Sequence, residues 1–278
     1  MFAKRPQIAM ACLSDRGRVR KENQDRVMID PTLGLFVLAD GMGGTRGGAY
    51  ASSIASEHFY RKMRHWLRWR WTRPWQFRPA HVLRTMQQTL LAANTRVYTT
   101  ASRDPELHGM GTTLVAGILQ GQDCLVVAVG DSRLYRSRNG VVEQITRDQT
   151  LAERLLSEGF LDADDPRMNR YVHVLTAVIG RKERPEIQHY HVCLQPGDRL
   201  LACSDGLSGA VSENCLATAL QREEPLGQLA NRLVAMANDA GGKDNISLVL
   251  IDMLTPQPPR TVPQLEEYRR ATATPDQG

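Results

Sequence analysis

The chain has no acidic residue between Glu57 and Asp104, although this stretch holds ten basic residues and all four tryptophans. The whole sequence has 35 Lys and Arg against 30 Asp and Glu, a formal charge of +5. Without those ten, 25 basic residues remain against 30 acidic ones, so the rest of the chain has a net charge of −5. The basic character therefore belongs to one segment.

Long apolar runs are also missing. No run approaches the roughly 20 residues needed to cross a bilayer, and residues 1–14 lack the apolar core and cleavage site of a secretory signal. The five cysteines show no C-x-x-C spacing, so we expect free thiols in a reducing compartment and no zinc-binding or catalytic cysteine. A composition of 42% hydrophobic and 23% charged residues excludes general disorder. We therefore expect a cytoplasmic globular protein.

Short apolar runs rich in Val, Leu and Ile predict β-strands at 8–13, 33–39, 112–119, 124–129, 199–203 and 246–254. Apolar residues at helical spacing predict helices at 48–67, 80–97, 151–156, 216–220 and 226–237. The helices fall in blocks between groups of strands and do not alternate with them, which favours an α+β fold over a doubly wound one.

The C-terminal segment differs in composition from the rest. From Pro256 onward it contains five prolines in 23 residues and few apolar side chains, which is typical of a solvated tail. We therefore predict a compact domain over residues 1–254 and a flexible Pro-rich tail over residues 255–278.

Four aspartates stand at or next to the ends of apolar runs, each close to a glycine: Asp40, Asp131, Asp205 and Asp244. A single Asp-Gly pair is usually a turn. Several carboxylates gathered at one sheet edge repel one another unless a cation neutralises them. No His or Cys stands at ligand spacing nearby, and an all-oxygen ligand set selects Mg²⁺ or Mn²⁺ over Zn²⁺. Two such ions sharing a carboxylate can activate a water for attack on phosphorus.

Six motifs follow one another along the chain: Ser14-Asp15-Arg16-Gly17-Arg18-Val19-Arg20-Lys21-Glu22-Asn23-Gln24-Asp25, Asp40-Gly41-Met42-Gly43-Gly44, Gly111-Thr112-Thr113, Gly130-Asp131-Ser132-Arg133, Ser204-Asp205-Gly206-Leu207 and Asp244-Asn245. Their order and spacing resemble the metal-dependent serine/threonine protein phosphatases of the 2C type, and most closely the small bacterial members. The resemblance covers about residues 7–253.

This resemblance implies a four-layer α-β-β-α sandwich, in which helices flank two antiparallel sheets. It implies a protein-serine/threonine phosphatase that hydrolyses phosphoserine and phosphothreonine with a water activated at a binuclear Mn²⁺ or Mg²⁺ centre. It further implies a monomer that acts on phosphorylated proteins and counteracts a bacterial Ser/Thr protein kinase.

The resemblance also implies roles for individual residues. Asp40 would bridge the two metals, and the carbonyl of Gly41 would bind the second. Asp205 and Asp244 would complete the first metal site, and Asp25 would hold metal-bound water.

Three further positions match less central parts of the family pattern. Arg20 would grip the substrate phosphate, because a guanidinium can contact two phosphoryl oxygens. Asp131 would bind a third, weaker metal. Asn169 is an additional candidate ligand for it, in a flap predicted over residues 151–184 that either gates the substrate or is a passive insertion.

The chain departs from the family pattern at two places where relatives carry a histidine, since it has Met42 and Thr45 there. Protonation of the leaving alkoxide would then come from water, from a metal-bound group or from another histidine such as His173. The sequence assigns no general acid.

The catalytic motifs allow two other interpretations. Gly-rich residues 41–48 could form a nucleotide-binding loop, but the G-K-[ST] ending and the H-R-D loop of nucleotide enzymes are missing. A phosphatase-like scaffold without activity would usually have lost a metal carboxylate or the phosphate-binding arginine, and both are present here.

The basic Trp-rich segment, residues 61–79, contains Trp66, Trp69, Trp71 and Trp75. We interpret it as an insertion that connects two helices. A protein-docking surface is the second interpretation, and binding to nucleic acid or to an anionic membrane is the third. Pro74 and Pro79 would interrupt one long amphipathic helix, which weakens the membrane interpretation.

Overall fold

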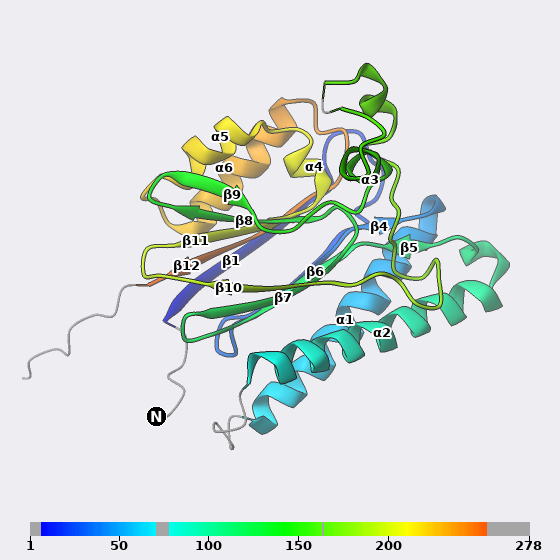
Figure 1. The fold of residues 1–278 in the computed structure, drawn as a ribbon, viewed down its shortest axis with the longest axis horizontal. Coiled ribbons are helices and arrows are strands. Elements are labelled where there is room, and N and C mark those ends of the chain that lie inside the picture. The colour runs from blue at the N-terminus through cyan, green and yellow to red at the C-terminus, as the bar shows by residue number, and fades with distance from the viewer. Residues whose placement is uncertain (1–6, 71–77, 163, 255–278) are drawn as a thin grey trace, which may run out of the picture.

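The computed structural model describes residues 7–70, 78–162 and 164–254. Figure 1 shows two sheets stacked face to face, with helices on both outer sides. Sheet A has the strand order β1-β12-β11-β8-β9 and sheet B the order β10-β7-β6-β3-β2. The neighbouring strands in both sheets are antiparallel. The predicted α+β sandwich is therefore confirmed.

Sheet A consists of β1 (Ile8–Asp15), β8 (Arg133–Arg138), β9 (Val141–Gln144), β11 (Arg199–Cys203) and β12 (Ile246–Met253). Sheet B consists of β2 (Arg26–Asp30), β3 (Leu35–Ala39), β6 (Leu114–Gln120), β7 (Asp123–Val129) and β10 (Gln188–Cys193). A small ribbon pairs β4 (Gly41–Met42) with β5 (Gly111–Thr112).

The helices are α1 (Gly44–Arg70), α2 (Pro79–Arg103), α3 (Leu151–Ser157), α4 (Asp205–Ser208), α5 (Glu213–Leu220) and α6 (Leu226–Asp239), with 3₁₀ turns η2 (Pro105–Leu107) and η3 (Pro166–Arg170). The long helices α1 and α2 cover sheet B, and α5 and α6 cover sheet A (Figure 1).

The central strands are buried on both faces, and their side chains alternate between two cores. In β7, Leu125 and Val127 pack against the helices of sheet B, whereas Cys124 and Val126 point between the two sheets. Strand β12 divides its side chains in the same way between the helix layer of sheet A and the inter-sheet core. Burial on both faces explains why these strands are continuous apolar runs in the sequence.

The predicted helices are present, and several extend beyond their expected bounds. Residues 61–70 of the basic segment continue α1, where Met63 and Leu67 are buried against sheet B. Trp66 packs partly into the same core, while Trp69 is half exposed. Helix α2 begins at Pro79, a favourable first position because proline has no N–H to leave unpaired. Residues 71–77, with Trp71 and Trp75, lie outside the described residues.

The sequence patterns missed β2, β8, β9 and β10. Strand β8 has the sequence RLYRSR, and its arginines are held by carboxylates of sheet A and its turns. Arg133 pairs with Asp148 at 2.8 Å, and Arg138 pairs with Asp198 at 2.6 Å. Such strands carry charged or polar side chains that find their partners only after folding. Their sequences therefore contain no apolar run from which a strand could be predicted.

The predicted flap is folded and tied to the body of the domain. Between β9 and β10 the chain forms α3 and η3, and then returns through an isolated bridge between Thr112 and Ile179. Asn94 of α2, fully buried, holds the next turn, because its side-chain amide donates to the carbonyls of Lys182 and Glu183 at 2.9 Å each. The side-chain oxygen of Asn94, Oδ1, accepts from the Gly180 N–H at 2.7 Å.

No helix among the described residues is both long enough and apolar enough to traverse a bilayer.

Replacing Asn94 should destabilise the domain, since Asn94→Ala leaves one amide and two carbonyls without their partner. We expect a loss of about 2–4 kcal/mol in the free energy of unfolding, measured by urea denaturation. Asn231→Ala is the matched control, because Asn231 is exposed on α6 and donates only to the Gly227 carbonyl of its own helix. Equal free energies of unfolding for the two variants would contradict this stabilising role of Asn94.

Candidate active site

Strand ends from both sheets meet at one end of the sandwich. In sheet B, Arg26 pairs with Ala39, so Asp25 and Asp40 leave the ladder next to each other. In sheet A, Cys203 pairs with Leu248, which brings the chain after β11 beside the chain before β12. Asp205 begins α4 directly after β11, and Asp244 precedes β12. The topology thus gathers carboxylates that lie far apart in the sequence.

The backbone at Asp40 is fixed from two sides. The N–H of Thr113 donates to the Asp40 carbonyl at 2.8 Å, and the hydroxyl of Thr112 donates to the same oxygen at 2.7 Å. The Asp40 N–H donates to the hydroxyl of Thr113 at 3.1 Å. A Cβ at Gly41 would lie 2.2 Å from the Gly48 carbonyl oxygen, so only glycine fits beside Asp40.

Asp40 lies at the centre of the carboxylates. Interaction with Asp40 is among the causes that set the pKa of both Asp25 and Asp205. Burial, followed by repulsion from neighbouring carboxylates, raises the pKa of Asp40 well above its ordinary value. These neighbours are Asp25, Asp205, Asp131 and Asp244. Without a positive charge among them, these carboxylates can stay close together only if some of them are protonated.

Asp25 is the most deeply buried of these side chains, with 1% of its surface exposed. The hydroxyl of Ser204 donates to its Oδ2 at 3.0 Å, whereas its buried Oδ1 has no hydrogen-bond partner among the described residues. Burial is the main cause that raises the pKa of Asp25 to about 6. A buried carboxylate oxygen without a donor is what a cation or an ordered water would satisfy.

Asp131 reaches the same region from the end of β7. Burial, with repulsion from Asp205 and Asp148, raises its pKa to about 7. The preceding Gly130 has a φ of +104°, and a Cβ there would lie 2.6 Å from the Thr113 side chain. Gln149 fixes this turn with two hydrogen bonds. Its side-chain oxygen accepts from the Gly130 N–H at 2.8 Å, and its backbone N–H donates to the Gly130 carbonyl at 3.0 Å.

Arg20 lies at the solvent side of the carboxylates. Its Nη2 donates to Oδ2 of Asp244 at 2.7 Å, and both side chains are partly exposed. The hydrogen bond to Asp244 is the largest contribution that raises the pKa of Arg20, and Asp205 and Asp40 add to it. Burial is the main cause that raises the pKa of Asp205. The guanidinium of Arg20 is therefore paired directly with one carboxylate of the cluster.

Asn245 holds the loop that carries Arg20. Its side-chain amide donates to the carbonyls of Arg16 and Glu22 at 2.9 Å each, and its Oδ1 accepts from the Gln24 N–H at 2.8 Å. In the sequence Asn245 is recognisable only as part of a motif, and its role in holding this loop is not predictable from it. The role of Gln149 was also missed, because no local pattern around it points to the Gly130 turn.

The flap contributes one group near the carboxylates. The positive charge that His173 can carry lowers the pKa of Asp205, which places its ring within electrostatic reach of the cluster. Asn169 is exposed on η3, and it makes no hydrogen bond to these carboxylates in the part of the chain that the structure describes. The structure thus gathers Asp25, Asp40, Asp131, Asp205 and Asp244 with Arg20, and a role for Asn169 stays a prediction.

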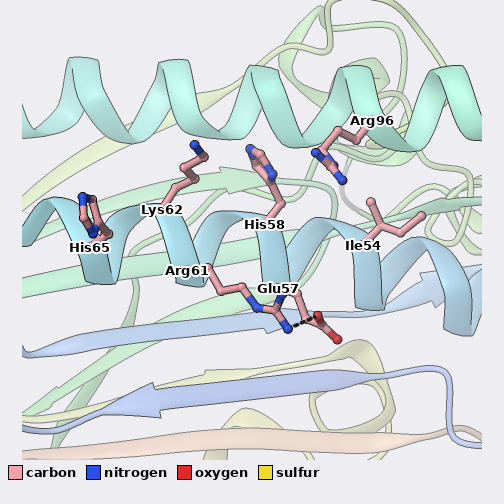
Figure 2. A pocket seen from close by; sticks show the side chains of 7 residues that line it. All are labelled: Ile54, Glu57, His58, Arg61, Lys62, His65 and Arg96. Atoms are coloured by element: carbon pink, nitrogen blue, oxygen red, sulfur yellow. Dashed lines mark ion pairs between the residues drawn. The ribbon is translucent and has the colours of Figure 1, made fainter.

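A second feature lies on the helical layer, between α1 and α2. A groove of about 440 Å³ is lined by Ile54, Glu57, His58, Arg61, Lys62, His65 and Arg96. Figure 2 shows these side chains on the two helices. Its one carboxylate, Glu57, is paired with Arg61 at 3.0 Å. The groove is therefore strongly basic and includes none of the clustered aspartates. It belongs partly to the basic Trp-rich segment, and a docking role for it stays a prediction.

The fold and the motifs agree with known proteins. The family model described as protein phosphatase 2C matches residues 16–251. A serine/threonine phosphatase, stp, of Listeria innocua is 32% identical over 243 residues, which cover 86% of this chain and 93% of the relative.

Solved structures show the same relationship. The crystal structure of the Mycobacterium tuberculosis serine/threonine phosphatase PstP/Ppp is 32% identical, with a TM-score of 0.74 over 89% of this chain and 99% of that chain. The catalytic domain of a serine/threonine protein phosphatase PstP, solved in complex with two manganese ions, has a TM-score of 0.73 at 32% identity, over 89% of this chain and 99% of that chain. On this evidence, the chain belongs to the protein phosphatase 2C family.

Proposed function

We propose that this protein is a metal-dependent protein-serine/threonine phosphatase that hydrolyses phosphoserine and phosphothreonine. The observation that carries the proposal is the buried carboxylate cluster around Asp40, in which Oδ1 of Asp25 lacks a partner. An inactive scaffold has no need to keep five mutually repelling carboxylates at one point. The stp and PstP relatives are named as serine/threonine phosphatases, which supports the same activity here.

The donor set fits a pair of hard divalent cations, because it offers carboxylate and carbonyl oxygens at one edge. We assign Asp40 as the bridge, Gly41 as a carbonyl ligand of the second ion, and Asp205 and Asp244 as ligands of the first. Mn²⁺ and Mg²⁺ are the candidate ions, and the two manganese ions of PstP favour Mn²⁺. When bound, the ions would supply the Lewis acidity that phosphoric-monoester hydrolysis by water requires. Asp131 is proposed as a ligand of a third ion, with Asn169 as a further candidate.

Arg20 and Asp25 have separate tasks in this proposal. Arg20 is partly exposed beside Asp244, so its guanidinium can turn from this carboxylate to two oxygens of a substrate phosphate. Asp25 is buried beside Asp40, so it can accept a hydrogen bond from the attacking water and orient it. The clamp made by Asn245 keeps the Arg20 loop in place for this contact.

His173 is our candidate proton donor for the leaving alkoxide. The two positions where family relatives carry a histidine are Met42 and Thr45 in this chain. His173 is exposed on the flap, and its charge is among the causes that lower the pKa of Asp205. A protonated imidazole there could deliver its proton to a departing serine or threonine oxygen.

We infer that the substrates are phosphorylated proteins, that the opposing enzyme is a bacterial Ser/Thr protein kinase, and that residues 1–254 act as a monomeric catalytic domain. The basic groove between α1 and α2 supports a surface for anionic substrate segments.

Neutralising the central carboxylate tests the metal centre. We expect Asp40→Asn to lower Mn²⁺-dependent turnover of p-nitrophenyl phosphate on the order of 10³-fold. The same change should raise the melting temperature of the metal-free protein by roughly 2–4 °C, because it removes one of the repelling charges. Asp205→Asn should lose activity at limiting Mn²⁺ in the same way.

Asp239→Asn is the control, because Asp239 is an exposed aspartate paired with Arg18 outside the cluster. Wild-type protein without Mn²⁺-dependent turnover, and indistinguishable from Asp40→Asn, would favour the inactive scaffold.

Removing the guanidinium of Arg20 tests phosphate binding. We expect Arg20→Ala to raise KM for a phosphothreonine peptide about 10–100-fold with a smaller effect on kcat, since a charge-assisted bidentate contact is lost. Arg18→Ala, two residues away and paired with Asp239, should leave KM unchanged. A reduced kcat at unaltered KM would argue against this role for Arg20.

The leaving group reveals whether His173 donates a proton. His173→Gln should lower kcat for a phosphoserine peptide about 100-fold, while p-nitrophenyl phosphate, whose leaving group needs no proton, should be hydrolysed at nearly the wild-type rate. His189→Gln, an exposed histidine on β10, is the control. Equal losses on both substrates would assign His173 a structural task.

A further inference from the structure

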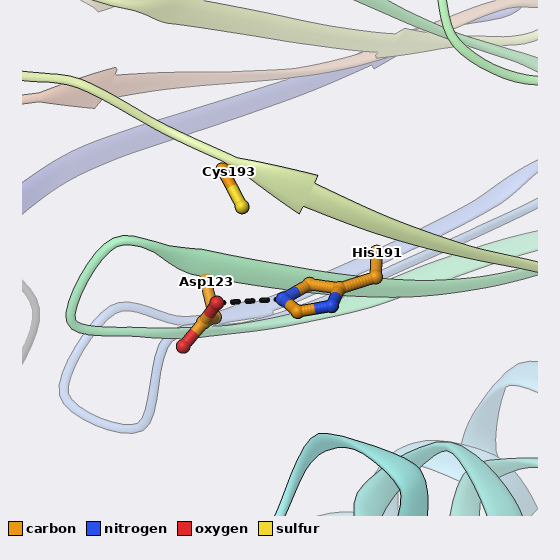
Figure 3. A group of neighbouring side chains, drawn as sticks. All are labelled: Asp123, His191 and Cys193. Carbon is orange, nitrogen blue, oxygen red and sulfur yellow. Dashed lines mark hydrogen bonds and ion pairs between the residues drawn. The ribbon is translucent and has the colours of Figure 1, made fainter.

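A second group of potential metal ligands lies at the opposite end of sheet B. It consists of Asp123 at the start of β7, and of His191 and Cys193 on β10. One ligand atom from each of the three side chains lies within 4.8 Å of the other two. Figure 3 shows the three side chains facing one another across the two strands. Nε2 of His191 and Oδ1 of Asp123 are 2.6 Å apart.

The strand register brings these residues together. Cys193 pairs directly with Asp123, so their side chains leave the same face of the sheet. His191 precedes Cys193 by two residues, and side chains two apart on a strand also share a face. The group is therefore set by the β7–β10 ladder and not by a loop.

The backbone around Cys193 is held on both sides. The N–H of Leu194 donates to the Gln122 carbonyl at 2.7 Å, beyond the last ladder pair. Nη2 of Arg138 donates to the Cys193 carbonyl at 3.0 Å, and the same arginine is paired with Asp198 at 2.6 Å. The side chains of His191 and Cys193 remain exposed, so an ion from solution can reach them. The backbone that positions them is already held in place before an ion binds.

We propose that Asp123, His191 and Cys193 bind a borderline divalent cation of the Zn²⁺ type. A thiolate, an imidazole and a carboxylate supply three positions of a tetrahedron, and water can take the fourth. With bonds of about 2.0–2.3 Å to the ion, ligand atoms on one tetrahedron lie roughly 3.3–3.7 Å apart. The His191–Asp123 contact must therefore open by less than about 1 Å, which the exposed imidazole can do.

The site differs from the catalytic carboxylates in chemistry and in position. The carboxylate cluster offers oxygen alone and suits Mn²⁺ or Mg²⁺, whereas sulfur and nitrogen ligands select softer ions. Asp123 begins β7 and Asp131 follows its end, so the strand separates the two sites by roughly 25 Å at about 3.3 Å per residue. An ion here would fasten the edge strand β10 to β7, and it does not depend on the proposed function.

The test uses the purified full chain without an affinity tag, saturated with Mn²⁺ so that the carboxylate cluster is occupied. Zn²⁺ is then titrated against a chromophoric chelator, and Co²⁺ is used as a spectroscopic probe. We expect one tight Zn²⁺ equivalent, a thiolate-to-cobalt charge-transfer band, and a melting temperature that rises by several degrees at a Zn²⁺ concentration about 100 times Kd.

Cys193→Ser should abolish the cobalt band and weaken Zn²⁺ binding at least about tenfold, and His191→Gln should weaken it similarly. Cys215→Ser, another exposed free cysteine, is the control and should bind as wild type does. Mn²⁺-dependent phosphatase activity should be equal in all of these proteins. The proposal is overturned if wild-type protein takes up no Zn²⁺ equivalent beyond Mn²⁺ saturation, or if Cys193→Ser keeps the cobalt band.

Discussion

Repulsion among buried carboxylates is the interaction around which this molecule is organised. Burial raises the pKa of Asp40 well above its ordinary value, and repulsion from four neighbouring carboxylates adds to this effect. Such a cluster destabilises the folded chain, so the remaining structure must hold it together against this repulsion. Under the proposed function, the same repulsion would give the cluster its affinity for divalent cations.

The sandwich supplies the necessary rigidity. Antiparallel pairing brings the end of β11 beside the start of β12, and the end of β3 beside the start of β2. Side-chain clamps then hold the loops at these ends: Asn245 fixes the Arg20 loop, and Gln149 fixes the Gly130 turn. Each of these two residues makes several hydrogen bonds to one segment, so a single residue orders a segment that carries a functional group.

The core strands and the site aspartates were predictable from local patterns. Strands buried on both faces must be continuous apolar runs, and Asp40, Asp131 and Asp205 could be recognised because they interrupt such runs next to a glycine. Strands such as β8 were missed, because charged side chains there find their partners only after folding. Asn94 and Gln149 were also missed, since a polar residue within a helix or a loop gives no sign of the distant backbone groups it will bond.

The family, the α+β class and the aspartates of the proposed site could be predicted from the sequence, because apolar periodicity and the order of the motifs are local properties of the chain. Which side chains meet depends on the folded chain. Arg20 and Asp244 are 224 positions apart, yet their side chains form an ion pair at 2.7 Å. The Asp123, His191 and Cys193 group likewise has no sequence spacing typical of a metal site. Its members become neighbours through the pairing of β7 with β10, which long-range folding alone establishes.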